Sequence, residues 1–279
     1  MNFVFVILTI AVLVTGIILM RRWKARQDGK SSRDYTNEII ARLECQYEVI
    51  IDAPDLSTVM NRYKALLAEG KIRGFTPVLL YPSHEIYNML VSSSTMSDYV
   101  NAREWIIEAS HTINAKDFLS QRFLSRGFNV GSSASFGAAK NKGPNTEFTR
   151  LMDFRGVRIK KARPYQKILV VKIPTINSWE VAAWLPCIGY NQVLFQEQVA
   201  ALRYWHEKYG AIPAALLNDG WELYVERPIR SLADEEELSN EFCSIVCGFS
   251  DSLHNSMVHM AAQTHNPSFI DATVWSLVI

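Results

Sequence analysis

The sequence predicts an α/β or α+β domain, a mixed sheet with packed helices, preceded by one N-terminal transmembrane helix. The first observation is an uncharged apolar run from Phe3 to Met20. The second is the alternation of short β-rich runs with segments of helical periodicity, which is typical of layered domains. The third is the stretch from Pro164 to Pro228, where an apolar strand, two helices and a hairpin follow one another.

Composition favours a folded domain in a reducing compartment. With 48% hydrophobic and 20% charged residues, the 279-residue chain can bury one substantial core or two small ones. A formal net charge of +1 gives no overall attraction to nucleic acid, and no specific nucleic-acid partner is expected. The cysteines are too sparse for the disulfide scaffold of a small secreted protein: Cys45, Cys187, Cys243 and Cys247.

Residues 1–22 are interpreted as a membrane anchor. The run from Phe3 to Met20 is close to the roughly 20 apolar residues that a helix needs to cross a bilayer core. A cleaved signal peptide is disfavoured because the charged n-region and a small-residue cleavage site are missing. The basic cluster that follows, Arg21 to Arg26, places that flank in the cytoplasm by the positive-inside rule. We therefore expect a single-pass protein of the cell inner membrane, with a short N-terminus outside and its domain in the cytoplasm.

A basic polar linker over residues 23–34 separates the anchor from a domain over residues 35–279. We expect a helix over 35–45, a strand over 47–51, and a helix from Leu56 that stops at Gly70. Apolar residues at i, i+3, i+4 and i+7 spacing indicate the second helix, and glycine is a common C-terminal stop. A second apolar strand is expected over 77–81.

Two further helices are expected over 98–109 and 115–124, and a flexible Gly-rich loop over about 127–163. The loop lacks the glycine and lysine order of a phosphate-binding loop and the glycine pattern of a nucleophile elbow. Its charge is mainly basic, which indicates a solvated face or, beside a membrane, contact with anionic lipid. The basic residues are Lys140, Lys142, Arg150, Arg155, Arg158, Lys160, Lys161, Arg163 and Lys167.

The Pro164 to Pro228 stretch is expected to begin with a strand over 167–173. A short helix follows that Ser178 can cap, then an amphipathic helix over 195–209. The runs 211–217 and 221–226 predict a hairpin, in which Gly220 is expected to need a positive φ. Alternation in the second strand predicts one buried face, with Glu222 and Glu226 on a face that meets solvent or a ligand. A last helix is expected to start near Ser231 and to run to about Phe249.

Several phrases carry a likeness to a known family: WEVAAWLP with Gly189-Tyr190-Asn191, EQVAALRYWHEKYGA, Asp219 with Glu222 and Pro228, and EFCSIV. Over Trp179 to Val246 the chain resembles the bacterial family catalogued as domain of unknown function 4253. The resemblance implies a fold of mixed helix and sheet and supplies no activity or catalytic residues. Two features depart from the family: many members lack an N-terminal anchor, and this chain ends HNPSFIDATVWSLVI instead of in a Trp- and Phe-rich strand followed by an acid. Because of the second departure, the sequence does not decide whether this chain forms the final strand of the family.

Two functions of different class fit these residues. The first is a membrane-anchored binding or interaction module with a protein partner, regulatory or toxin-neutralising in kind. Aromatic residues anchor many interfaces, although they also fill cores. The candidate binding residues are Trp184, Tyr190, Asn191, Trp205 and Tyr209.

The alternative is an acid/base hydrolase whose carboxylates converge beside the sheet with His206 or Asn191. Burial can move the pKa of such groups toward neutrality. The candidate carboxylates are Glu180, Asp219 and Glu222. No cofactor or metal site is expected, because His206-Glu207 lacks the second histidine of a zinc motif and the cysteines lack ligand spacing.

Overall fold

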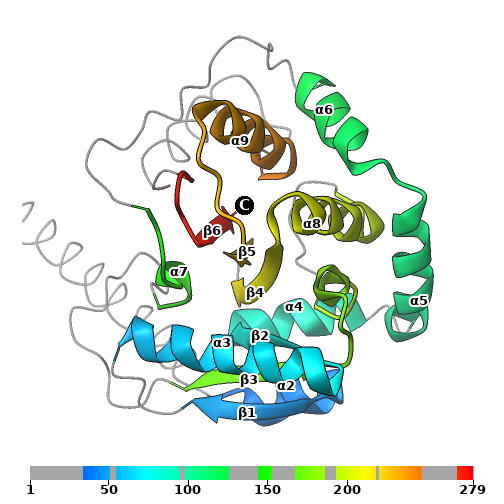
Figure 1. The fold of residues 1–279 in the computed structure, drawn as a ribbon. Coiled ribbons are helices and arrows are strands. Elements are labelled where there is room, and N and C mark those ends of the chain that lie inside the picture. Colours follow the sequence, from blue (N-terminus) through cyan, green and yellow to red (C-terminus); the bar gives the residue numbers. More distant parts are fainter. Residues whose placement is uncertain are drawn as a thin grey trace, which may run out of the picture.

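A six-stranded mixed sheet forms the centre of the molecule (Figure 1). The computed structural model describes residues 34–50, 55–94, 98–125, 144–152, 167–185, 193–217, 220–246 and 269–278. The strand order is β1-β3-β2-β4-β5-β6, with β2 and β4 parallel and the other neighbours antiparallel. The strands are β1 (Gln46–Ile50), β2 (Thr76–Leu80), β3 (Ile168–Ile173), β4 (Ala211–Leu217), β5 (Gly220–Val225) and β6 (Val274–Val278). The predicted mixed α/β architecture is confirmed.

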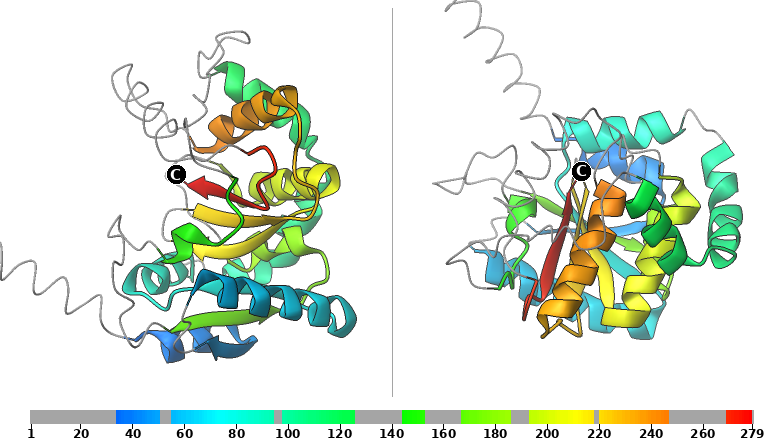
Figure 2. Two further views of the ribbon diagram at one scale, coloured as in Figure 1. Left: turned by 60° about the vertical axis from the view of Figure 1, so that its left-hand side comes forward. Right: turned by 90° about the horizontal axis from the view of Figure 1, so that it is seen from above.

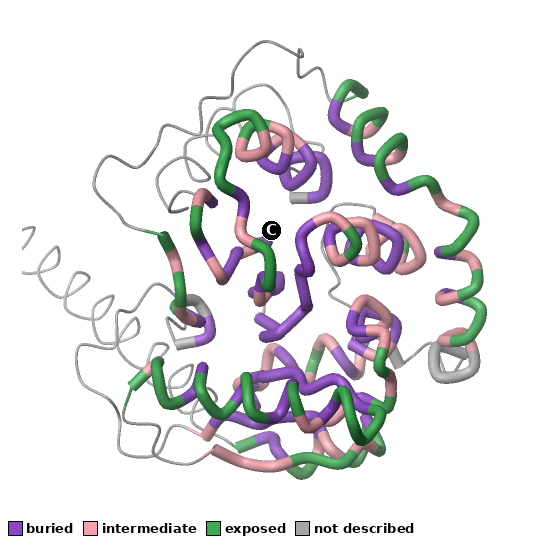
Figure 3. The backbone as a smooth tube through the Cα atoms, viewed as in Figure 1, coloured by how far each residue is buried: buried purple, intermediate pink, exposed green. Residues whose placement is uncertain are grey.

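Helices cover both faces of this sheet (Figures 1 and 2). One face packs on α2, α4, α8, α9 and the 3-10 helix η2, with α5 and α6 outside α8, while α3 and α7 cover the other face. Buried positions concentrate in the central strands and exposed ones on the outer sides of α3, α5 and α6 (Figure 3). The bounds are α2 (Thr36–Leu43), α3 (Leu56–Arg73), α4 (His84–Ser94), α5 (Asp98–His111), α6 (Ala115–Ser125), α7 (Thr149–Met152), η2 (Ser178–Ala183), α8 (Phe195–Tyr209) and α9 (Leu232–Val246).

The second helical layer corrects the expectation for β5. Alternation predicted a solvent-facing side for this strand, but Glu222 is 0% exposed, and only Glu226, just past the strand, reaches solvent. The reason is α7, whose Leu151 backbone N–H donates to Oε2 of Glu222 at 2.9 Å. A carboxylate can be accommodated at a buried position when a backbone donor meets it there.

Two glycine assignments also change. The α3 helix does not stop at Gly70 but continues to Arg73, and Gly74 caps it with a φ of 79°. The predicted hairpin between β4 and β5 is confirmed, but Leu217 pairs with Gly220 in its register. That pairing makes Gly220 the first residue of β5 and leaves only 218–219, outside the described residues, for the turn.

The ends of several other elements follow local chemistry. Ser231 Oγ accepts from the Asp234 backbone N–H at 3.1 Å, as expected of a helix cap. The 3-10 helix η2 begins at Ser178 itself, so its N-cap is Asn177 rather than the predicted Ser178. Gly210 ends α8 with a φ of 65°, a conformation that glycine adopts at little steric cost.

Three elements were not predicted as such. The α4 helix follows β2 after three residues, and the C-terminal strand β6 pairs with β5 over Val274–Val278, completing the sheet. The third is α7, which lies within the predicted flexible loop; there the prediction is wrong, because Phe148 and Leu151 are buried against the sheet. The predicted anchor over Phe3 to Met20 and most of the predicted Gly-rich loop lie outside the described residues. Of the helices in the described ranges, none is long and apolar enough to cross a membrane.

Candidate binding site between α6, α8 and α9

The predicted acid/base residues do not form one cluster. Glu222 lies on the sheet face covered by α7, whereas His206 lies at the end of α8 on the opposite face. Glu180 accepts hydrogen bonds from Thr175 Oγ1 at 2.5 Å and Asn177 Nδ2 at 2.9 Å, which stabilise the loop before η2. Asp219, Tyr190 and Asn191 lie outside the described residues.

His206 contacts Ser178, but the two side chains cannot act as a catalytic base and its nucleophile. Its Nδ1 lies 3.2 Å from Ser178 Oγ and 3.2 Å from the Ala211 carbonyl oxygen. Because a carbonyl can only accept, Nδ1 carries the proton and cannot take one from Ser178. Ser178 is also only 4% exposed, and burial lowers the pKa of His206. The pair therefore holds η2 against the end of α8.

The aromatic candidates belong to the core. Trp205 is 0% exposed and Tyr209 5% exposed, and both rings pack in the layer between the sheet, α8 and α9. Trp184 is half-buried, with the Arg103 guanidinium 4.0 Å from its ring centroid. These rings stabilise the helical layer, and Trp205 has a further role because its indole N–H meets a carboxylate.

That carboxylate, Glu241 of α9, lies at the centre of a polar cluster with α8. Tyr204 donates its hydroxyl hydrogen to Oε1 at 2.8 Å, and Trp205 Nε1 donates to Oε2 at 2.8 Å. Lys208 Nζ lies 3.7 Å from the same Oε1 and 2.7 Å from Oε2 of Glu237, one turn earlier on α9. Tyr204 and Lys208, one turn apart on α8, thus contact Glu241 and Glu237, one turn apart on α9.

The electrostatics of this cluster follow from burial and pairing. Burial raises the pKa of Glu241 despite the nearby Lys208 and the hydrogen bonds from Tyr204 and Trp205. Burial and the Glu241 charge raise the pKa of Tyr204, so this phenol stays protonated and is not a general base. Burial alone would lower the pKa of Lys208, but its bonds to Glu237 and the tyrosines raise it, so the ammonium stays charged.

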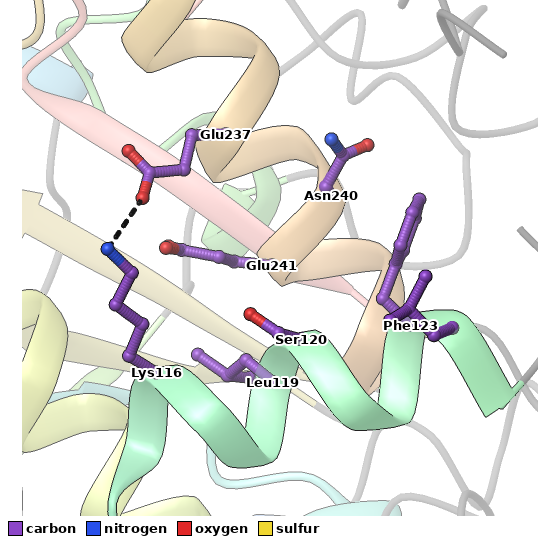
Figure 4. A pocket seen from close by; sticks show the side chains of 8 residues that line it. Lys116, Leu119, Ser120, Phe123, Glu237, Asn240 and Glu241 are labelled. Atoms are coloured by element: carbon purple, nitrogen blue, oxygen red, sulfur yellow. Dashed lines mark ion pairs between the residues drawn. The ribbon is translucent and has the colours of Figure 1, made fainter. Parts of the chain in front are cut away.

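A pocket of about 150 Å³ opens beside Glu241, between α6 and α9 (Figure 4). Its apolar wall comes mainly from α6, where Leu119 and Phe123 are buried and Leu124 is 53% exposed. Its polar wall carries Lys116 and Ser120 from α6 and Glu237, Asn240 and Glu241 from α9. Lys116 Nζ reaches Glu237 Oε1 at 3.9 Å across one end, and Arg122 Nε donates to the Ser244 carbonyl at 2.8 Å near the other. The two helices are thus joined on both sides of the opening.

The pocket contains hydrogen-bonding side chains that have no partner in the part of the chain that the structure describes. The side chains of Ser120 and Asn240 make no hydrogen bond within the described ranges. Glu241 is held by two donors, and a carboxylate can accept about four hydrogen bonds. The same ranges contain no group of three or more His, Cys, Asp or Glu that could hold a metal ion. The arrangement is therefore suited to binding a small polar and apolar group.

Sequence reasoning missed this site. The available signal was the pairing of Tyr204 with Lys208 and of Glu237 with Glu241 at i, i+4 on two helices, which places each pair on one face. The sequence does not show that α8 packs on α9, so it could not predict that these two pairs contact each other. The pocket wall on α6 (Ala115–Ser125) lies far before α8 (Phe195–Tyr209) in the chain. Periodicity within windows of about 11–18 residues cannot show that such distant helices pack together.

Comparison with known proteins extends the family resemblance. Residues 169–277 match the model of a family described as a domain of unknown function (DUF4253). The match includes all of α8 and α9, and reaches into β6. No curated protein and no solved structure matches the chain. The Glu241 cluster therefore lies within the matched segment, whereas α6 lies before it.

Proposed function

We propose that this protein is a membrane-tethered binding module that receives a side chain of a protein partner in the pocket between α6 and α9. The observation that carries the proposal is the pocket itself, in which a fixed, buried carboxylate adjoins an apolar wall. Perturbed acidic groups beside a concave apolar surface are typical of functional sites. A regulatory or neutralising action on the partner would suit such a module.

The size of the pocket favours a side chain over a cofactor or a metabolite. Ligand pockets for drug-sized molecules measure roughly 300–1,000 Å³, and this one measures about 150 Å³. Buried anchor side chains in small pockets supply much of the affinity in protein interfaces. Leu124, at the rim and 53% exposed, provides apolar surface that a partner would cover.

The tether is supported by sequence. The uncharged Phe3 to Met20 run and the basic residues after it favour an inner-membrane anchor with the domain on the cytoplasmic side. The basic residues between 140 and 167 are the part of the chain that anionic lipid would attract in that case. We do not propose the acid/base alternative, because His206 and Glu222 lie on opposite faces of the sheet.

Photo-crosslinking in intact membranes tests the proposal. A photoreactive phenylalanine analogue replaces Ser120, which lines the pocket, or Gln121, the next residue of α6, which is exposed and does not line it. We expect a discrete adduct with a second protein from position 120 only. Equal adducts at both positions, or none at position 120, would contradict a partner side chain in the pocket.

A further inference from the structure

We infer that the side chain received by this pocket is cationic, a lysine or arginine of the partner. This inference rests on the proposed function and adds the chemistry of the occupant. It follows from which charges around the pocket are fixed and which can move away. The residues involved are Lys116, Lys208, Glu237 and Glu241.

The negative groups are held in place. Glu241 is 8% exposed, and its two oxygens are fixed by Tyr204 and Trp205 at 2.8 Å each. Glu237 is oriented by Lys208 at 2.7 Å, which approaches from α8 and does not line the pocket. The acceptors that face an occupant are thus preorganised, which reduces the entropic cost of binding.

The positive group that lines the pocket is held loosely. The Lys116 side chain is 66% exposed, and its ammonium lies 3.9 Å from Glu237. Exposed pairs of this kind contribute little and exchange readily with solvent. A cation from a partner can therefore take the place of Lys116 beside Glu237. A carboxylate or phosphate would instead meet the oxygens of Glu237 and Glu241, whose combined charge Lys208 balances only in part.

The remaining walls fit the rest of a lysine or arginine side chain. Such side chains have an apolar stem and a charged end. Leu119 and Phe123 would contact the methylene groups, while Ser120 and Asn240 offer further oxygen acceptors near the opening. A side chain of neutral aliphatic character would satisfy only the apolar wall.

The test is titration of the full-length protein, in detergent or nanodiscs, with amino-acid derivatives blocked at both ends. The probes are the blocked derivatives of lysine, arginine, norleucine and glutamate. The indole N–H resonance of Trp205 is the readout, since that hydrogen is donated to Glu241. We expect saturable shifts with lysine and arginine, at least about threefold weaker binding of norleucine, as loss of an exposed ion pair would give, and no shift with glutamate.

Two variants of α9 provide a matched comparison. Glu237→Gln removes a carboxylate that lines the pocket, and Glu236→Gln removes the neighbouring, exposed one. We expect Glu237→Gln to weaken lysine binding about two- to fivefold, the range for a partly exposed ion pair, with norleucine binding unchanged. Glu236→Gln should bind all derivatives as the parent does.

Other results of the titration would contradict the cationic assignment. Equal binding of norleucine and lysine would overturn the cationic assignment and leave the crosslinking result at position 120 to support a binding module. A saturable shift with the glutamate derivative would overturn the cationic assignment as well. If no derivative binds while the adduct at position 120 persists, the occupant is not a lysine or arginine side chain.

Discussion

Glu241 determines how α8 and α9 meet, because one carboxylate accepts from both Tyr204 and Trp205 and lies beside Lys208. Removing it leaves a buried indole donor without an acceptor. Such a loss costs more than the hydrogen bond itself contributes, since the donor keeps its desolvation penalty. The effect of substitution therefore depends on what replaces the carboxylate.

We expect Glu241→Ala to lower the free energy of unfolding by about 2–4 kcal/mol, as for other broken buried polar networks. Glu241→Gln should cost about 1 kcal/mol, because its amide can accept from Trp205 and donate to Tyr204. Glu236→Ala, on the exposed side of α9, should stay within about 0.5 kcal/mol of the parent. Urea unfolding followed by tryptophan fluorescence measures all three, and equal values for Glu241→Ala and Glu236→Ala would show that the cluster adds no stability.

The raised pKa of Glu241 also sets the sign of a pH effect. Its folded-state pKa lies above the ordinary value of 4.5, mainly because of burial. The folded protein therefore binds this proton more tightly than the unfolded chain, and the contribution of Glu241 to stability increases as pH falls through the folded-state pKa toward 4.5. We expect the difference in unfolding free energy between the parent and Glu241→Gln to grow over that window. A difference that shrinks on acidification would place the folded-state pKa below 4.5.

At the scale of elements, the turn from α3 into β2 depends on close backbone packing at Gly70. A Cβ added there would lie 2.1 Å from the backbone oxygen of Phe75, whereas one added at Gly74 would meet nothing within 4 Å. Gly70 is thus required for the approach of β2 to α3, and Gly74 for the left-handed cap.

We expect Gly70→Ala to destabilise the protein by about 2–4 kcal/mol, because backbone atoms must shift to admit the methyl group. Gly74→Ala should cost about 1–2 kcal/mol, the strain of a left-handed residue with no clash. Thermal and urea unfolding measure which of the two variants loses more stability. A Gly74→Ala protein less stable than Gly70→Ala would show that the observed packing of the turn is wrong.

Element existence was predictable from sequence wherever local periodicity and local turns determine it. The strand over 167–173 and the helix over 195–209 were predicted within a residue or two of β3 and α8. The burial of Glu222 was not, because alternation cannot show that α7 covers the second face. The site around Glu241 could not be predicted for the same reason. Its hydrogen-bond donors, Tyr204 and Trp205, lie on another helix, and no local pattern shows that the two helices pack together.

In the whole molecule, helices pack on both faces of the central strands, and the exposed part of the sheet is the edge strand β1, where Tyr47 is 45% exposed. In the helical layer, α6 and α9 leave a pocket at the periphery, and this is where we propose that a partner binds.

The orientation of the anchor gives a prediction of its own. A fluorescent protein fused to the C-terminus should fluoresce, and an alkaline phosphatase fusion at the same place should be inactive, if the basic flank holds the domain in the cytoplasm as the positive-inside rule predicts. The membrane fraction should keep the protein through an alkaline carbonate wash. An active phosphatase fusion would show that the domain lies outside the cytoplasm. Release by carbonate would show that residues 3–20 do not span the membrane.

Partner affinity in pocket-filling variants tests whether a partner binds in the pocket between α6 and α9. Ser120→Phe fills the pocket from the exposed side of α6, and Gln121→Phe adds the same ring outside the pocket. We expect the partner captured at position 120 to bind Ser120→Phe at least about tenfold more weakly than the parent, a change of about 1.4 kcal/mol, and Gln121→Phe unchanged. Equal affinities of the two variants would show that the pocket between α6 and α9 is not where this protein binds its partner.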